Sequence, residues 1–323
     1  MRNVFLRTLA LLLVLVSGLA SAQSAWPSRP IRFIVPYPPG GAADAVARLV
    51  GQEMSKSLGQ QIVIENRGGG GGTIGVAAGI KSAPDGYTMF LATTASIAIN
   101  PMFMATKPYD SLRDISLVGM LAISPLALVV PASSPIHSIP DLVAAAREKP
   151  GGIGFGTAGN GTPHHLAGET LNQMYGIKLT HVPYKGSGPA AVDLVAGQLP
   201  AAIIDVTSII TQVRAGRARA LATLGNKRTA VAPEVASMAE AGVPDFDISG
   251  WFLLGVPAAT PREIVARLNQ ELVRILSLPE VRERFIASGV EARPTAPEET
   301  AAFVRDQVEK WGQRFRASGA TLD

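Results

Sequence analysis

Short apolar runs alternate with amphipathic helical segments through most of this 323-residue chain. An apolar run followed by a loop and a helix is typical of a buried strand in an α/β protein with mostly parallel sheets. Candidate strands are Ile31–Val35, Ile62–Glu65, Thr88–Ala92, Ile153–Gly156, Leu179–Val182, Ala201–Asp205, Ala220–Thr223 and Phe252–Val256. Candidate helices are Gly41–Ser57, Asp141–Glu148, Thr162–Tyr175, Pro189–Ala196 and Pro261–Leu276.

The first of these strand-loop-helix units carries the clearest functional pattern. The run Ile31–Val35 ends at two prolines and two glycines, and apolar residues recur at helical spacing from Ala45 onward. The unpaired backbone N–H groups of the first helical turn would point at whatever lies above the strand, and such an end attracts carboxylates and phosphates. The pattern predicts an anion-binding loop. A β-branched residue in place of Gly41 is expected to block both the turn and the approach of a ligand.

A second unit resembles the first. Ile153–Gly156 passes through small residues into a helix, with Thr162 as the expected N-cap and Pro163 at the first helical position, where its missing N–H is harmless. We therefore expect two anion-binding loops, one in each of two lobes, to face each other across a cleft.

Several other motifs argue against catalysis or a cofactor. Residues 154–159 match GxGxxG, but no acidic residue follows the next strand, so a nucleotide is not expected. The adjacent His164 and His165 would point about 100° apart on a helix, so we expect neither a metal site nor any cofactor. Ser187 precedes a helix and is expected to serve a turn or a cap. Asp205 ends a strand, where it could orient a ligand group or cap the next helix.

The N-terminus has the pattern of a cleavable export signal. Arg2 and Arg7 flank the start, Leu9–Val16 is continuously apolar, and Ala20-Ser21-Ala22 satisfies the small-x-small cleavage rule. We expect cleavage after Ala22 and a periplasmic mature protein. Hydrophobic residues make up 47% of the chain, which excludes disorder, and the lack of cysteine excludes disulfides and thiolate metal sites. Basic residues are scattered, so no nucleic-acid partner is expected.

Two lobes are expected because about 300 mature residues are long for one core. A loop- and strand-rich stretch at 125–140 and a further interruption of the pattern at 245–250 suggest two crossings between the lobes, and two crossings make a hinge. The expected division is a signal peptide at 1–22, lobe 1 at 23–124 and 249–323, and lobe 2 at 125–248. The helices of residues 261–316 are expected to cover the sheet of lobe 1. The glycine run 68–72 could wrap a ligand or serve as a flexible connection to a helix at Thr73–Lys81.

Many motifs, in order along the whole mature chain, resemble the Bug family, the extracytoplasmic solute receptors of tripartite tricarboxylate transporters. They are Trp26-Pro27, Pro30-Ile31-Arg32, Val35–Gly41 with Asp44, Leu58-Gly59-Gln60, Glu65-Asn66-Arg67, Ala83–Thr88, Asn100-Pro101, Pro108-Tyr109-Asp110, His181–Gly186, Glu240–Pro244, Trp251 and Lys310-Trp311. The chain departs from the family at Gly68, where a proline is common, and at the apolar Val206.

The resemblance implies an α/β fold of the two-lobed periplasmic binding protein type (type II-like), with mostly parallel sheets and a ligand cleft between the lobes. It also implies that a ligand carboxylate is held by both strand-helix loops, largely through backbone groups and ordered waters. Asp44 would hold the first turn and His165 would lie behind the second. The implied ligand-binding residues are Tyr37, Pro38, Pro39, Gly40, Gly41, Asp44, Thr93, Thr94, Ser96, Thr157, Ala158, Gly159, Asn160, Gly161, Thr162, His165 and Asp205.

The function implied is capture of a small carboxylate and its delivery to the permease subunits of a tripartite tricarboxylate transporter, by a monomer. The ligand could be a dicarboxylate, a tricarboxylate, an amino acid or an aromatic acid. One alternative is an exported α/β enzyme acting on a carboxylate, for which only Asp205 and the pair His164 and His165 could supply a reactive group. A second alternative is a receptor that signals to a sensor protein.

Overall fold

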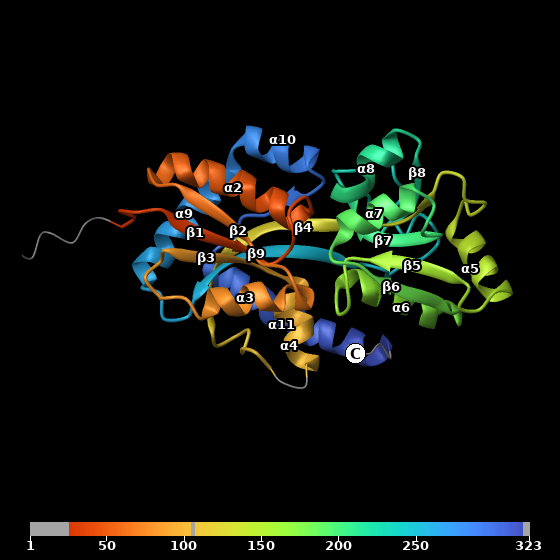
Figure 1. Cartoon of the computed structure of the whole chain (residues 1–323), viewed down its shortest axis with the longest axis horizontal. Helices are drawn as coiled ribbons and strands as arrows, with labels where there is room; N and C mark the ends of the chain where they lie inside the picture. Colours follow the sequence, from red (N-terminus) through yellow and green to blue (C-terminus); the bar gives the residue numbers. More distant parts are fainter. Residues whose placement is uncertain (1–25, 105–106, 319–323) are drawn as a thin grey trace, which may run out of the picture.

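The computed structural model describes residues 26–104 and 107–318, and Figure 1 shows them as two lobes side by side. The strand order is β2-β1-β3-β9-β4-β7-β5-β6, with β8 and β10 also pairing with β4. The strands are β1 (Ile31–Val35), β2 (Ile62–Asn66), β3 (Thr88–Thr93), β4 (Ile115–Pro131), β5 (Ile153–Thr157), β6 (Leu179–Pro183), β7 (Ala201–Asp205), β8 (Ala218–Thr223), β9 (Ser249–Pro257) and β10 (Glu291–Ala292). The expected α/β fold of the binding-protein type is confirmed.

Parallel pairing brings the loops after the strands to one edge in each lobe. In the first lobe β1 pairs in parallel with β2 and β3, and in the second β5 pairs in parallel with β6 and β7. The helices α2 (Ala42–Leu58), α6 (Pro163–Tyr175), α7 (Ser187–Val195) and α8 (Val206–Arg214) follow β1, β5, β6 and β7. Because a ligand in such a fold lies beyond the carboxyl ends of the strands, these four helix starts surround the place where it would bind.

Two long strands join the lobes. The first half of β4 pairs antiparallel with β9, and its second half pairs antiparallel with β7 and β8. Pro125, where the sequence suggested a loop-rich crossing, lies inside β4 and is paired with Ser249. The lobe boundaries proposed from the sequence stay predictions, but β4 and β9 are the strands that pass between the two groups of parallel strands.

Helices cover both faces of the first sheet. One face holds α2, α9 (Arg262–Ser277) and α10 (Pro279–Ala287), whose buried residues Val46, Leu272 and Phe285 share one core. On the other face are α3 (Thr73–Ile80) and α11 (Pro297–Ser318), below the sheet in Figure 1. The last helix, α11, contacts β4 and η2 of the first lobe and also α6 of the second. The buried Trp311 anchors α11 in a core shared by both lobes, so packing determines its position.

The remaining elements are short. They are α4 (Asn100–Phe103), α5 (Ile139–Glu148), the 3-10 turn η1 (Gly70–Gly72) and the π-helical turn η2 (Ala95–Ile99). Among the described residues we found no helix of the length and apolar character that a bilayer span requires. The signal peptide and cleavage site predicted at residues 1–22 lie outside the described residues.

Candidate functional site

The loop between β1 and α2 forms the first wall of a cavity between the lobes. Gly40 adopts φ 94°, which the left-handed region allows for glycine, and Gly41 is extended with φ −92° and ψ 176°. The expectation that a β-branched residue at Gly41 would block the turn is therefore wrong, because any residue adopts this backbone conformation. A Cβ built on Gly41 has no atom within 4 Å, so a side chain there would meet open space.

Asp44 holds this loop from behind. Its Oδ2 accepts hydrogen bonds from Gly40 N at 3.1 Å and from Arg48 Nε at 2.9 Å, and its Oδ1 accepts one from Asn66 Nδ2 at 3.0 Å. Burial alone would raise the pKa of Asp44, but these donors outweigh it and lower that pKa. An ionised carboxylate therefore fixes the turn. All its oxygens face protein donors, and it does not line the cavity.

The loop between β5 and α6 forms part of the opposite wall. Thr162 is the N-cap of α6, as predicted, and its Oγ1 accepts a hydrogen bond from His165 N. Thr157 Oγ1 accepts a bond from Gly159 N at 3.2 Å and lies 2.6 Å from His181 Nε2. Side-chain hydroxyls at both ends therefore fix the loop while its middle stays open to the cleft.

Two stacked histidines support this second loop. The rings of His165 and His181 are 3.8 Å apart and nearly parallel, and Gly161 N donates to His165 Nδ1. Burial lowers the pKa of His165 to about 4, and burial together with the charge of His165 lowers the pKa of His181 to about 3. Both rings are neutral at neutral pH, so the stack acts as a structural support.

A third loop, between β6 and α7, brings Ser187 to the cavity, which the sequence analysis did not predict. Ser187 Oγ donates to Asp205 Oδ2 at 2.6 Å, and Ser124 Oγ donates to Asp205 Oδ1 at 2.7 Å. His164 Nε2 lies 3.4 Å from Asp205 Oδ2. Burial would raise the pKa of Asp205, but His164 and the two hydroxyls lower it below its usual value. Asp205 occupies the N-cap position of α8, but its side chain makes no capping hydrogen bond. The sequence-based alternative that Asp205 caps the next helix is therefore correct for its position and not for its hydrogen bonding.

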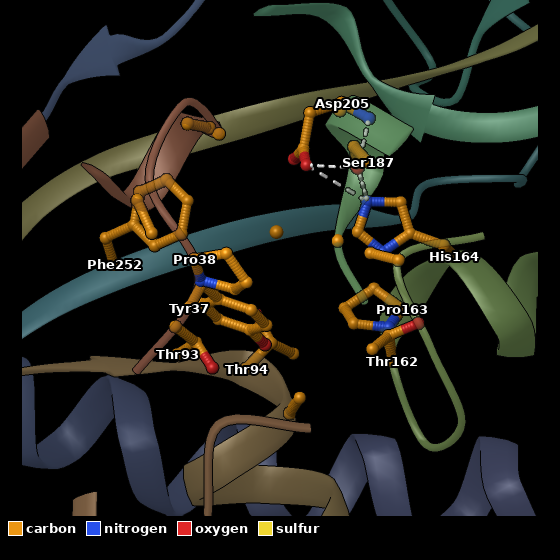
Figure 2. A pocket seen from close by; sticks show the side chains of 18 of the residues that line it. Tyr37, Pro38, Thr93, Thr94, Thr162, Pro163, His164, Ser187, Asp205 and Phe252 are labelled. Atoms are coloured by element: carbon orange, nitrogen blue, oxygen red, sulfur yellow. Dashed lines mark hydrogen bonds and ion pairs between the residues drawn. The ribbon is translucent and has the colours of Figure 1, made fainter. Parts of the chain in front are cut away.

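Figure 2 shows these walls facing each other, with Tyr37, Pro38 and Phe252 on one side and Pro163 and His164 on the other. The cavity has a volume of about 170 Å³. Its wall contains the first residues of α2, α6 and α7 and the residue before α8, and the rest is mostly apolar. The starts of several helices therefore meet at one small cavity, and few polar side chains line it.

The structure brings about half of the predicted site residues to this cavity. Those that line it are Tyr37, Pro38, Pro39, Gly41, Thr93, Thr94, Ala158, Thr162 and Asp205. Gly159 and Asn160 line an adjoining cavity instead. The others do not line the first cavity and lie in the elements and loops around it: Gly40, Asp44, Ser96, Thr157, Gly161 and His165.

Sequence reasoning missed the other lining residues, some of them next to predicted residues and some from separate segments. They are Ala42, Ala43, Ala95, Pro163, His164, Lys185, Gly186, Ser187, Gly188, Pro189, Gly250, Trp251 and Phe252. The segment 184–189 could have been found by the rule applied to the first two loops, since it too joins a strand to a helix. Among the described residues, no group of three metal-ligating side chains is positioned to hold an ion.

Comparisons with known proteins agree on one family. The model described as "Tripartite tricarboxylate transporter family receptor" matches residues 46–319. Protein BugT of Bordetella pertussis is 37% identical over 96% of this chain and 96% of its own. An R. palustris protein solved with adipate is 33% identical, with TM-score 0.88, over 91% of this chain and 98% of its own. MatC from Rhodopseudomonas palustris, solved with bound malate, is 30% identical, with TM-score 0.84, over 90% of this chain and 99% of its own.

Proposed function

Since the chain belongs to the tripartite tricarboxylate transporter family of receptors, we propose that the cavity between its lobes holds one carboxylate group of a small acid. The family predicted from the sequence motifs is confirmed. The protein is a solute-binding receptor for carboxylates that serves such a transporter, and it is not an enzyme. The residues that hold the ligand are our proposal.

The observation that carries this proposal is the meeting of three helix N-termini at one cavity. Helices α2, α6 and α7 have 17, 13 and 9 residues, and their first residues all line it. Each N-terminus carries a partial positive charge of about +0.5, although in α6 Pro163 has no N–H and His165 N donates to Thr162, so together the three N-termini favour an anion. The apolar remainder of the wall would exclude water and strengthen these hydrogen bonds.

Asp205 gives the cavity a second kind of recognition. Its ionised carboxylate lies at the start of α8 and accepts hydrogen bonds from Ser187 and Ser124, not from the backbone of that helix. We assign the ligand carboxylate to the other three helix starts and assign Asp205 to a hydroxyl, an amine or a water molecule on the ligand. Thr93 and Thr94, at the end of β3, supply hydroxyl groups on the opposite wall.

A thermal-shift screen of residues 23–323 tests the proposal, with malate, adipate, benzoate and their matched amides. A ligand that binds only the folded state stabilises it by about 2.7 kcal/mol at a hundredfold excess over Kd. We expect at least one acid to raise the melting temperature and its amide to leave it unchanged. Equal shifts with acid and amide, or none with any acid, would contradict the anion site.

Export and delivery complete the proposed function. Family members are periplasmic binding proteins. We infer that a signal peptide is removed after Ala22 and that the closed monomer docks onto the permease subunits of the transporter. N-terminal sequencing of protein from the periplasmic fraction checks the cleavage site, and mature protein beginning elsewhere than Gln23 would correct it.

A further inference from the structure

A second cavity adjoins the first and is larger. It has a volume of about 460 Å³ and shares Tyr37, Pro38, Ala158 and Lys185 with the cavity of about 170 Å³. We call the smaller one the inner compartment and the larger one the outer compartment. The glycine run 69–72 forms one side of the outer compartment. Because glycines carry no side chains, that side leaves room for the far end of a ligand.

Lys185 lies where the two compartments meet. The segment around it is fixed to the second-lobe loop, since Tyr184 N donates to Thr157 O and Gly186 N donates to Ala158 O, both at 3.1 Å. Its side chain is exposed and has no hydrogen bond or ion pair with any described residue. Of the described residues that line either compartment, Lys185 is the only lysine or arginine.

An acidic side chain lines only one of the two compartments. Asp205 lines the inner compartment alone and is held there as a carboxylate by Ser187 and Ser124. A second acidic group on a ligand would be repelled by Asp205, while the ammonium of Lys185 attracts it. The lowest-energy orientation of a ligand with two acid groups therefore places the first at the helix starts and directs the second outward.

We propose that Lys185 is a specificity-determining residue, which recognises a second anionic group that the ligand extends into the outer compartment. This proposal rests on the proposed function, because it assumes that a first carboxylate occupies the inner compartment. An exposed ammonium with no partner keeps its hydration until a ligand arrives, so we expect a moderate gain. Charge-assisted hydrogen bonds of this kind correspond to about tenfold in affinity.

Two six-carbon acids isolate this interaction. Adipate has a carboxylate at each end of its six-carbon chain. Hexanoate has a chain of the same length with a carboxylate at one end only. Calorimetric titration of residues 23–323 would compare both acids with the wild type, with Lys185→Gln and with Lys178→Gln. Lys178 is an exposed lysine that lines neither compartment, so its variant controls for a general loss of positive charge.

We expect the wild type and Lys178→Gln to bind adipate about tenfold more tightly than hexanoate. In Lys185→Gln the preference for adipate should be lost, so that the two acids bind equally. Three outcomes would overturn the role of Lys185 and leave the proposed function intact. The wild type could bind hexanoate as tightly as adipate, or Lys185→Gln could lose affinity equally for both acids. The third outcome is that the wild type binds malate or benzoate but not adipate. If none of the four acids binds, the proposed function fails and this inference fails with it.

Discussion

Ser187 Oγ donates a hydrogen bond of 2.6 Å to Asp205 Oδ2, and so joins the first residue of α7 to the last residue of β7. Ser187 also accepts a hydrogen bond from Asp205 N at 3.2 Å. Ser124, on the strand β4 that passes between the lobes, donates to the other oxygen of the same carboxylate. The orientation of Asp205 in the cavity wall is therefore fixed by hydroxyl groups from two separate elements.

Replacing Ser187 by alanine tests this arrangement. A buried carboxylate that loses a charged hydrogen bond destabilises the fold, so we expect Ser187→Ala to lower the free energy of unfolding by about 2 kcal/mol. Urea unfolding measures this change. The matched control is Ser208→Ala, because Ser208 Oγ is buried without a hydrogen-bond partner and its removal should change stability by less than about 0.5 kcal/mol. Equal losses in both variants would show that the Ser187–Asp205 bond contributes nothing.

The stacked histidines predict that the protein loses stability in mild acid. The folded protein binds a proton at His165 only near pH 4 and at His181 only near pH 3, whereas the ordinary value is 6.5. Between about pH 6.5 and pH 4 the unfolded chain therefore binds more protons than the folded protein. The free energy of unfolding should be constant above this window and fall as the pH falls through it, by as much as a few kcal/mol.

Chemical denaturation at pH 7, 6 and 5 measures this dependence. His165→Phe keeps an aromatic ring in the stack but removes one titrating group, so its stability should fall less steeply below pH 6.5. His137→Gln, at an exposed position before α5, should retain the wild-type slope. A slope in His165→Phe as steep as that of the wild type would contradict the assignment of this pH dependence to the stack.

Gly71 and Asn160, from opposite lobes, both line the outer compartment. Gly71 adopts φ 60°, and a Cβ there would lie 2.3 Å from Asn100 Nδ2 and 3.3 Å from Asn160 O of the second lobe. We expect Gly71→Ala to hold the lobes apart and to weaken ligand binding at least tenfold. The control is Gly176→Ala, at φ 58° with no atom within 4 Å.

Both glycine variants introduce a similar backbone strain of about 1 kcal/mol, and Gly71→Ala adds the clash with Asn100 to this loss of stability. Only Gly71→Ala adds atoms between the lobes. Calorimetric titration with an acid found in the screen, alongside thermal unfolding of each variant, separates the two effects. A Gly71→Ala protein with wild-type affinity would contradict the close approach of the glycine run to Asn160.

The parts of the fold that could be predicted from the sequence are those with local causes. The helix after Thr162 has its cap and its proline at fixed positions, and the strand Ile31–Val35 is buried on both sides, so each pattern is complete within a few residues. The strand β4 was not among the predicted strands, because Gly119, Ser124 and Pro125 interrupt its apolar pattern. Its pairing with β9, more than 120 residues away, stabilises it despite those interruptions.

In the candidate site, too, the residues with a local sequence pattern could be predicted and the others could not. The first two loops were found because each joins a strand to a helix through small residues. Ser187 was expected to serve only a turn or a cap, since nothing near it in the sequence indicates that Asp205 lies 2.6 Å away. Trp251 and Phe252 reach the cavity from β9, where their apolar side chains look like those of any buried strand. Such contacts arise from strand order, which local patterns do not determine.

The central claim is that helix N-termini around the inner compartment hold a carboxylate, and Gly41→Val tests it most directly. The extended backbone of Gly41 accepts valine, and the new side chain would fill space at the start of α2. We predict that the melting temperature without ligand stays within about 2 °C of the wild type. Calorimetric titration with the acid found in the screen should show binding to the wild type and at least a hundredfold loss in Gly41→Val. A folded Gly41→Val protein that binds the acid with wild-type affinity would contradict the account.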